Sequence, residues 1–328
     1  MRRLFILLLL AGAGGSWFFF QKYRIDGIDR VSLKPRGTVA DSTAFENTVA
    51  DAASPPQRPT QTIRIASFDV QKFDAAKLGR PEVMKTVLDV VRRFDVIAIQ
   101  GISTPRDDLM AVVIEQLNYN GRHFDYVIGP RSGGDAAPEQ LAFILDAASV
   151  EVDRSTMYTV DDPARLLRRD PLVATFRVRG PEPKDAFTFA LVNVHVDAQR
   201  ASSELDALAD VYRAVRNNGL GEDDIILLGN LGADDRRLGL LGQLPNMTSA
   251  LTAAPTNTRG TKMVDNILFN REATIEFTGR AGVLDLMHEC SLTMPQALQV
   301  SDHLPIWAEF SIYEGGQPGR LATRPESR

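Results

Sequence analysis

The stretch Ser301-Asp302-His303-Leu304-Pro305 places an acid and an imidazole side by side at the head of a largely apolar run, residues 305–310. Such a short run predicts a buried strand. Holding an adjacent acid and base at the end of a buried strand costs free energy unless both find partners. A functional role is therefore favoured over a purely structural one for this pair.

Outward from this stretch, short strand-like runs alternate with helical ones. Helices are predicted at 81–94, 109–117 and 201–216, where apolar residues recur at helical spacing. Strands are predicted at residues 63–70, 96–99, 141–145, 172–178, 187–194, 224–228, 264–269 and 305–310. Two mixed sheets packed face to face, with helices on their outer faces, accommodate this order. The predicted fold class is α+β, a four-layer sandwich.

Several segments at the ends of these runs carry polar residues in a fixed order. The strings are Ile-Arg-Ile-Ala-Ser-Phe-Asp-Val-Gln at 63–71, Phe-Asp-Val-Ile-Ala-Ile-Gln-Gly at 94–101, Glu-Gln at 139–140, Arg-Asp-Pro at 169–171, Val-Asn-Val-His at 192–195, Ile-Leu-Leu-Gly-Asn-Leu-Gly-Ala-Asp at 226–234, Val-Asp-Asn-Ile-Leu-Phe at 264–269 and Ser-Asp-His-Leu-Pro at 301–305. Together they resemble the endonuclease/exonuclease/phosphatase family, which includes pancreatic deoxyribonuclease. The ordered set, more than any one string, carries the resemblance.

The resemblance implies a deoxyribonuclease-like domain over residues 63–312 that hydrolyses phosphoesters with a divalent metal ion. It implies that His303 is the general base and that His195 donates a proton or a hydrogen bond to the phosphate or the leaving group. Asp265 would polarise a histidine or position the water. Taken alone, His195 is as consistent with a structural histidine, whereas Asp265 within a buried strand favours function.

The resemblance also implies that Asp302 is a metal ligand with Asp69 and Glu139 nearby, and that Asn230 and Arg169 bind substrate. The implied cofactor is Mg²⁺ or Mn²⁺, because hard cations prefer oxygen ligands. Glu139 lies in a segment rich in Gly and Ala, where solvation alone also accounts for it.

The sequence departs from the family pattern at three positions. Gly101 stands where the family has a metal-binding glutamate, Asn230 where it has an aspartate, and Gly232 where it has an asparagine that contacts phosphate. Asp69 replaces an expected asparagine and returns one negative charge. We therefore predict weak Mg²⁺ binding in the free protein. We also predict that Gly101→Glu combined with Asn230→Asp strengthens it.

Two functions follow from these departures. One is weak or impaired phosphodiester hydrolysis by a metal-dependent nuclease or phosphoesterase; the other is an inactive family member that binds a ligand or partner. A lipid phosphatase is a third interpretation, without an aromatic or basic cluster to support it. The substrate is expected to be a phosphoester, with nucleic acid as one candidate class, although the net charge of -5 gives no global basic field. No protein partner can be inferred.

The N-terminal segment predicts a membrane address. Arg2 and Arg3 precede a run without charged residues, 4–20. This pattern favours a signal anchor that spans residues 1–24, and a cleaved signal peptide is the alternative. The positive-inside rule then places the domain outside the cytoplasm. Residues 25–62 are interpreted as a flexible linker and residues 313–328 as a disordered tail, because neither has a sustained apolar period. The single cysteine, Cys290, excludes an intramolecular disulfide.

Overall fold

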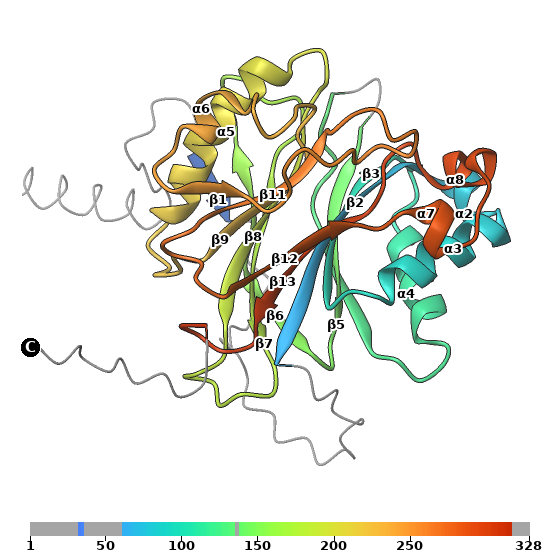
Figure 1. Ribbon diagram of the computed structural model, residues 1–328, viewed down its shortest axis with the longest axis horizontal. Helices are drawn as coiled ribbons and strands as arrows, with labels where there is room; N and C mark the ends of the chain where they lie inside the picture. Colours follow the sequence, from blue (N-terminus) through green and yellow to red (C-terminus); the bar gives the residue numbers. More distant parts are fainter. Residues whose placement is uncertain (1–31, 36–60, 135–137, 317–328) are drawn as a thin grey trace, which may run out of the picture.

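The computed structural model describes residues 32–35, 61–134 and 138–316. Two mixed sheets pack face to face, and helices cover the outer face of each (Figure 1). One sheet has seven strands in the order β1-β6-β7-β8-β9-β11-β10, and the other has six in the order β12-β13-β2-β3-β5-β4. The predicted fold class, two packed mixed sheets flanked by helices, is confirmed.

The strands of the seven-stranded sheet are β1 (Ser32–Pro35), β6 (Val150–Asp161), β7 (Leu172–Val178), β8 (Thr188–His195), β9 (Ile225–Asn230), β10 (Met247–Ser249) and β11 (Asp265–Asn270). Those of the six-stranded sheet are β2 (Thr62–Phe73), β3 (Val96–Ile102), β4 (Phe124–Ile128), β5 (Gln140–Asp146), β12 (Phe277–Val283) and β13 (Ile306–Ser311). The helices are α2 (Ala75–Leu78), α3 (Pro81–Val91), α4 (Leu109–Asn118), α5 (Ala201–Arg216), α6 (Gly239–Gly242), α7 (Leu286–Glu289) and α8 (Met294–Val300).

Three apolar layers hold the sandwich together. The central layer lies between the sheets and contains a chain of ring contacts that joins Phe143, Phe176, Phe189, Phe187 and Phe310. A second layer packs α3, α4, α7 and α8 on the six-stranded sheet, and a third packs α5 and α6 on the seven-stranded sheet. Burial of this apolar surface is the main stabilising term of such a fold.

Strand register brings the candidate residues to one end of the sandwich. His195, the last residue of β8, pairs with Asn230, the last residue of β9. Asn230 also pairs with Asp265 at the start of the antiparallel strand β11. In the other sheet, Asp69 of β2 pairs with Gln100 of β3. Residues far apart in sequence therefore meet because their strands end together.

A buried polar bridge connects the two sheets below this end. The Gln100 side chain donates to Asn193 Oδ1 at 2.7 Å and lies 3.0 Å from the Ser67 hydroxyl. Asn193 in turn donates to the carbonyl oxygens of Ile99 and Ala142. Because an unpaired amide at this depth costs free energy, the closed set of partners fixes the relative position of β3 and β8.

The linker interpretation needs a correction at one point. Within residues 25–62, Ser32–Pro35 forms β1, which pairs antiparallel with β6 (Ser32 opposite Asp161). The edge of β6 offers free backbone groups that a short segment can pair with, and proline is tolerated on an edge strand. The tail interpretation also shifts, since Glu314 donates its amide to Asp185 O and Tyr313 bridges to Ala186.

No described helix has the length and apolar character needed to cross a bilayer. The predicted signal anchor, residues 1–24, lies outside the described residues.

Candidate active site

Asp69 is the centre of the candidate site. Its side chain is buried at the point where β2 ends, and its Oδ1 accepts the Gln71 amide at 2.9 Å. Asp69 Oδ2 accepts the Asn230 amide at 3.0 Å and lies 3.3 Å from His195 Nε2 and 3.9 Å from His303 Nε2. Two imidazoles and one amide therefore face a single carboxylate oxygen.

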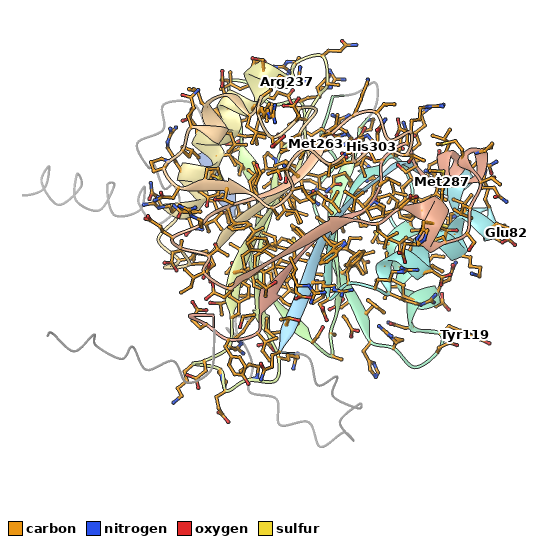
Figure 2. The ribbon with its side chains drawn as sticks, in the orientation of Figure 1. Glu82, Tyr119, Arg237, Met263, Met287 and His303 are labelled. Atoms are coloured by element: carbon orange, nitrogen blue, oxygen red, sulfur yellow. The ribbon has the colours of Figure 1, made fainter. Side chains whose placement is uncertain are left out.

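The His303 imidazole is held from behind by Asp265. His303 Nδ1 lies 2.9 Å from Asp265 Oδ2, and Thr256 donates its hydroxyl to the same oxygen at 2.8 Å. This arrangement fixes the ring and leaves Nε2 facing Asp69, with Asp302 Oδ1 at 3.8 Å. Figure 2 labels His303 in the upper part of the molecule.

The His195 imidazole is held by Glu139. His195 Nδ1 lies 2.9 Å from Glu139 Oε2, a close electrostatic contact in which Nδ1 makes no aligned hydrogen bond. Arg169 binds both oxygens of Glu139, at 2.7 and 2.8 Å, as a bidentate pair. The carboxylate and the guanidinium thus bind each other, and Glu139 also lies against the His195 ring. That Glu139 ligates a metal and that Arg169 binds substrate remain predictions.

The charges of the site follow from these contacts. Burial alone would raise the pKa of Asp69, but the charges of His195 and His303 and the amide hydrogen bonds keep it below its usual value, so Asp69 is ionised. Burial would lower the pKa of His303, but Asp265 outweighs it, with Asp69 and Asp302 contributing, and raises this pKa to about 9. In the metal-free protein, His303 is therefore protonated at neutral pH.

Asn230 and Gly232 form hydrogen bonds with neighbouring residues of the site. The Asn230 side chain donates to Asp69 and accepts the Gly232 amide at 3.0 Å, which orients the amide group. A Cβ on Gly232 would lie 3.3 Å from Ala201 Cβ, although its φ of +64° is one that asparagine tolerates. The asparagine that the family pattern has at 232 would therefore need the start of α5 to shift.

The Asp69 side chain leaves no room for a side chain at position 101. A Cβ on Gly101 would lie 2.7 Å from Asp69 Oδ1 and 2.8 Å from the Gln71 amide nitrogen, at a φ of +78°. The Asp69 carboxylate thus occupies the volume into which a side chain at 101 would project. Gly101→Glu with Asp69 unchanged should disrupt the site, which corrects the prediction that Gly101→Glu with Asn230→Asp strengthens Mg²⁺ binding.

Two oxygen donors at this end remain suited to a divalent cation. Asp302 Oδ1 is buried without a hydrogen-bond partner although half of the side chain is exposed, and Asp69 is ionised. In the described part of the chain, no three carboxylate, imidazole or thiol groups at this end approach closely enough to share one cation. The donor set therefore fits a cation that needs further oxygen ligands from a substrate or water.

Two buried residues that the sequence analysis did not select support the strand ends. Lys77 donates to the carbonyl oxygens of Val70, Gln71 and Val300, and Ser301 donates its hydroxyl to Asp69 O at 2.6 Å. Burial lowers the pKa of Lys77 to about 8, while the nearby acids oppose the shift. These contacts join the segment after β2 to the segment before β13. A lysine in the first helix after a strand carries no sequence signal for such a role.

No family model matches the chain. Human deoxyribonuclease gamma is 28% identical over 273 residues, which cover 76% of this chain and 86% of that protein. Bovine deoxyribonuclease-1-like 1 is 27% identical over 278 residues, covering 80% and 86% respectively.

Solved structures share the fold. The human Nocturnin catalytic domain with bound sulfate superposes with a TM-score of 0.52 at 15% identity and covers 77% of this chain and 95% of its own. A humanized D. rerio TDP2 gives the same TM-score and identity and covers 77% and 100%. The chain is therefore similar in sequence to deoxyribonucleases, and its fold is consistent with the endonuclease/exonuclease/phosphatase superfamily.

Compared with the family pattern, the chain has exchanged an asparagine and an aspartate between the two ends of one hydrogen bond. The superfamily pattern has asparagine at the position of Asp69 and aspartate at the position of Asn230. Here the carboxylate belongs to Asp69 and the amide to Asn230, and the two groups form a hydrogen bond of 3.0 Å. The pair keeps one negative charge, and the charge now sits on β2, where a glutamate at 101 would collide with it.

We expect the His303 imidazole to titrate near pH 9, well above the usual value of about 6.5. Because the folded-state pKa is raised, the stability that it contributes is complete below pH 6.5 and is lost as pH rises through about 9. Proton NMR of the purified chain, with the resonance assigned through His303→Gln, measures this pKa. Asp265→Asn should lower it by at least about one unit. Titration of His303 near pH 6.5 in the unmodified chain would contradict the assignment.

Proposed function

We propose that this chain is a nuclease that hydrolyses phosphodiester bonds of DNA with a weakly held divalent cation. The observation that carries the proposal is the arrangement at Asp69, where the Nε2 atoms of His195 and His303 both face one carboxylate oxygen, at 3.3 and 3.9 Å. Each ring is held at its Nδ1 side by a separate acid, Glu139 or Asp265. The names of the relatives, deoxyribonuclease gamma and deoxyribonuclease-1-like 1, support DNA as the substrate.

The two histidines have different roles in this proposal. Neutral His303 accepts the proton of the attacking water at Nε2, and Asp265 stabilises the imidazolium that forms. The water oxygen bonds to phosphorus as the bond to the leaving oxygen breaks. His195 donates a proton or a hydrogen bond toward the phosphate and the leaving oxygen. Because His303 must be neutral to accept a proton, activity should rise with pH through the neutral range.

Asp69 and Asp302 would hold the cation together with phosphate oxygens of the substrate. When bound, it would supply charge stabilisation for the phosphoryl oxygens. An ionised Asp69 between the imidazoles would otherwise repel a phosphate, so this carboxylate needs a positive partner when DNA binds. Weak binding in the free protein is proposed because only two carboxylates would hold the cation, and Asp69 already accepts two hydrogen bonds.

An exposed arginine next to the site supports a nucleic-acid substrate. A surface hollow lined by Pro255, Thr258, Arg259 and Leu304 lies beside His303, whose carbonyl oxygen accepts the Thr258 hydroxyl. Arg259 is exposed and forms no ion pair with another described residue. A cation in this position can pair with a phosphate of a DNA strand that crosses the site. Asp285 also lines this hollow, so Arg259 supplies a single local positive charge in a chain whose net charge is -5.

We further propose that the domain is held on the extracytoplasmic side of a membrane. The support is the sequence, in which Arg2 and Arg3 precede the uncharged run 4–20. Fractionation of cells with the full chain should recover it in the membrane fraction, and protease added outside should digest the domain. Recovery of the chain in the cytoplasm would overturn this proposal without touching the catalytic one.

The exchange of Asp69 and Asn230 gives the sharpest test of the catalytic proposal. We expect Asp69→Asn to reduce hydrolysis of duplex DNA at least about a hundredfold, because the charge of the pair is removed. The double variant Asp69→Asn/Asn230→Asp should regain activity to within about tenfold of the unmodified chain, because one carboxylate returns to the pair. Initial rates at saturating Mg²⁺ or Mn²⁺ measure both effects.

The matched control is Asp234→Asn, which removes a carboxylate from the surface turn after β9. Asp234 pairs with Arg237 at 2.7 Å, and Figure 2 shows Arg237 at the outside of the molecule. We expect this variant to keep full activity. A proposal built on the Asp69 pair is wrong if Asp69→Asn hydrolyses DNA as fast as the control. It is also wrong if the double variant stays as inactive as the single one.

A further inference from the structure

A second group of acids gathers at the opposite end of the sandwich from the histidines. Asp224 immediately precedes β9, whose last residue, Asn230, lies in the candidate active site. Six residues of extended chain separate the two, which corresponds to about 20 Å. The carboxylates of Asp224, Glu276 and Glu314 offer oxygens within 4.8 Å of one another, and those of Glu222, Asp223 and Asp224 do the same.

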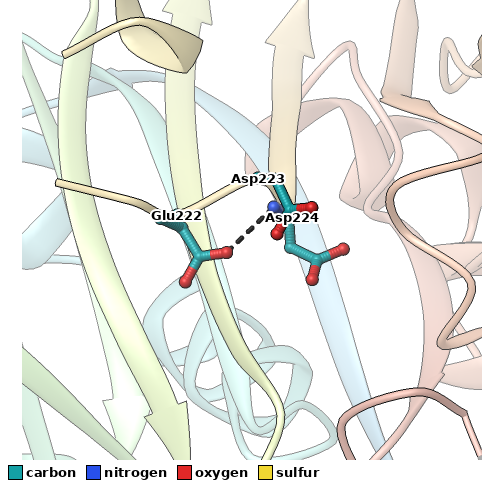
Figure 3. Close-up of side chains that lie close together, drawn as sticks. All are labelled: Glu222, Asp223 and Asp224. Atoms are coloured by element: carbon teal, nitrogen blue, oxygen red, sulfur yellow. Dashed lines mark hydrogen bonds between the residues drawn. The ribbon is translucent and has the colours of Figure 1, made fainter. Parts of the chain in front are cut away.

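Backbone hydrogen bonds hold the segments that carry these acids next to one another. Asp224 O accepts the Ala190 amide, Glu276 O accepts the Ser311 amide, and the Glu314 amide binds Asp185 O. Figure 3 shows Glu222 folded back toward Asp224, with its carboxylate accepting the Asp224 amide at 2.9 Å. The acids therefore come from the segment before β9, the segment before β12 and the chain after β13 rather than from one acidic run.

Three polar atoms in this group are buried without an aligned hydrogen bond, although Thr274 and Glu276 both lie against Asp224. The three atoms are Asp224 Oδ1, Glu276 Oε2 and Thr274 Oγ1, and the exposed fractions of the three residues are 2%, 2% and 1%. Buried oxygen atoms that lack a partner cost free energy, and a carboxylate costs more than a hydroxyl. The three oxygens point to a positive ligand or to bound protons.

No side chain supplies the missing positive charge. In the described ranges, no lysine, arginine or histidine forms an ion pair with Asp224, Glu276, Glu222 or Glu314. Burial, reinforced by the charge of Glu276, raises the pKa of Asp224 to about 9, and burial raises that of Glu276 to about 7. Without a cation, the group must therefore hold protons at neutral pH.

We propose that Asp224, Glu276 and Glu314, with Thr274 and Glu222 beside them, form a structural binding site for Ca²⁺. Several carboxylates from separate segments suit Ca²⁺, which takes six to eight oxygen ligands in flexible geometry, better than Mg²⁺. Glu314 and Asp223 are exposed, so the ion can enter from solvent. The bound ion would join the start of β9, the segment before β12 and the chain after β13.

Thermal unfolding of the purified full chain tests this site. We expect millimolar Ca²⁺ to raise Tm relative to EDTA by several degrees, since a ligand that binds only the folded state stabilises it. The double variant Asp224→Asn/Glu276→Gln should lose most of this shift. Mg²⁺ at the same concentration should give a smaller shift.

Two further variants keep the result decisive. Glu314→Gln is at an exposed position, so it should fold normally and weaken Ca²⁺ binding at least about tenfold in calorimetry. Glu115→Gln, on an exposed face of α4, is the matched control and should respond as the unmodified chain does. No Ca²⁺ shift in the unmodified chain would mean that the acids share protons instead. An equal shift in the double variant would place the ion elsewhere.

Discussion

The buried carboxylate of Asp69 is the constraint on which the candidate site depends. It stands at the end of β2, close to both histidines, and its two oxygens are held by the Gln71 and Asn230 amides. A charge at this depth is stable only with such partners. Its place explains two departures together, because Asn230 must donate to Asp69 and Gly101 must leave room for it. The departures at Gly101 and Asn230, which in the sequence look like lost metal ligands, both accompany the carboxylate at Asp69.

The scaffold beneath Asp69 is built to hold this rearrangement. Lys77 and Ser301 tie the segment after β2 to the segment before β13, and Gln100 with Asn193 connects the two sheets. The Gln71 and Lys72 backbones adopt φ values of 48° and 49°, which cost free energy for residues other than glycine. Lys77 binds the carbonyl oxygen of Gln71 and so supports this turn. A buried polar network therefore supports a locally strained strand end.

The sequence predicted the strands that are buried on both faces, and missed those that are not. Strands such as β3, β8 and β9 are continuous apolar runs and were located within a few residues. The twelve-residue strand β6 was missed, because Val150–Asp161 is half exposed and carries charges along it. Strand β12 contains two glycines, and β1 gains its structure only from the edge of β6. Their strand character comes from tertiary pairing rather than from local sequence.

The sequence pointed to residues that the structure brings together, but not to their contacts. His195, Asp265 and His303 were found because ordered motifs mark strand ends, and register brings those ends together. The contacts of Glu139 with Arg169 and His195 could not be foreseen, since a loop residue gives no sign of its distant partners. The same is true of the exchange at Asp69, which depends on a hydrogen bond spanning 161 residues. The acids around Asp224 are scattered along the chain, so only the fold reveals them.

The claim that Asp69 is the cation-binding carboxylate is tested most directly by Mn²⁺ binding followed by electron paramagnetic resonance. The full chain is titrated with Mn²⁺ with and without a hydrolysis-resistant phosphorothioate oligonucleotide, and the Mn²⁺ that the oligonucleotide binds alone is subtracted. The remaining increment isolates this site from the acids near Asp224. The account predicts about one additional Mn²⁺ per chain when the oligonucleotide is present, because phosphate oxygens complete a donor set of two carboxylates. Asp69→Asn should abolish that increment. An increment of zero in the unmodified chain, or an equal one in Asp69→Asn, would contradict the account.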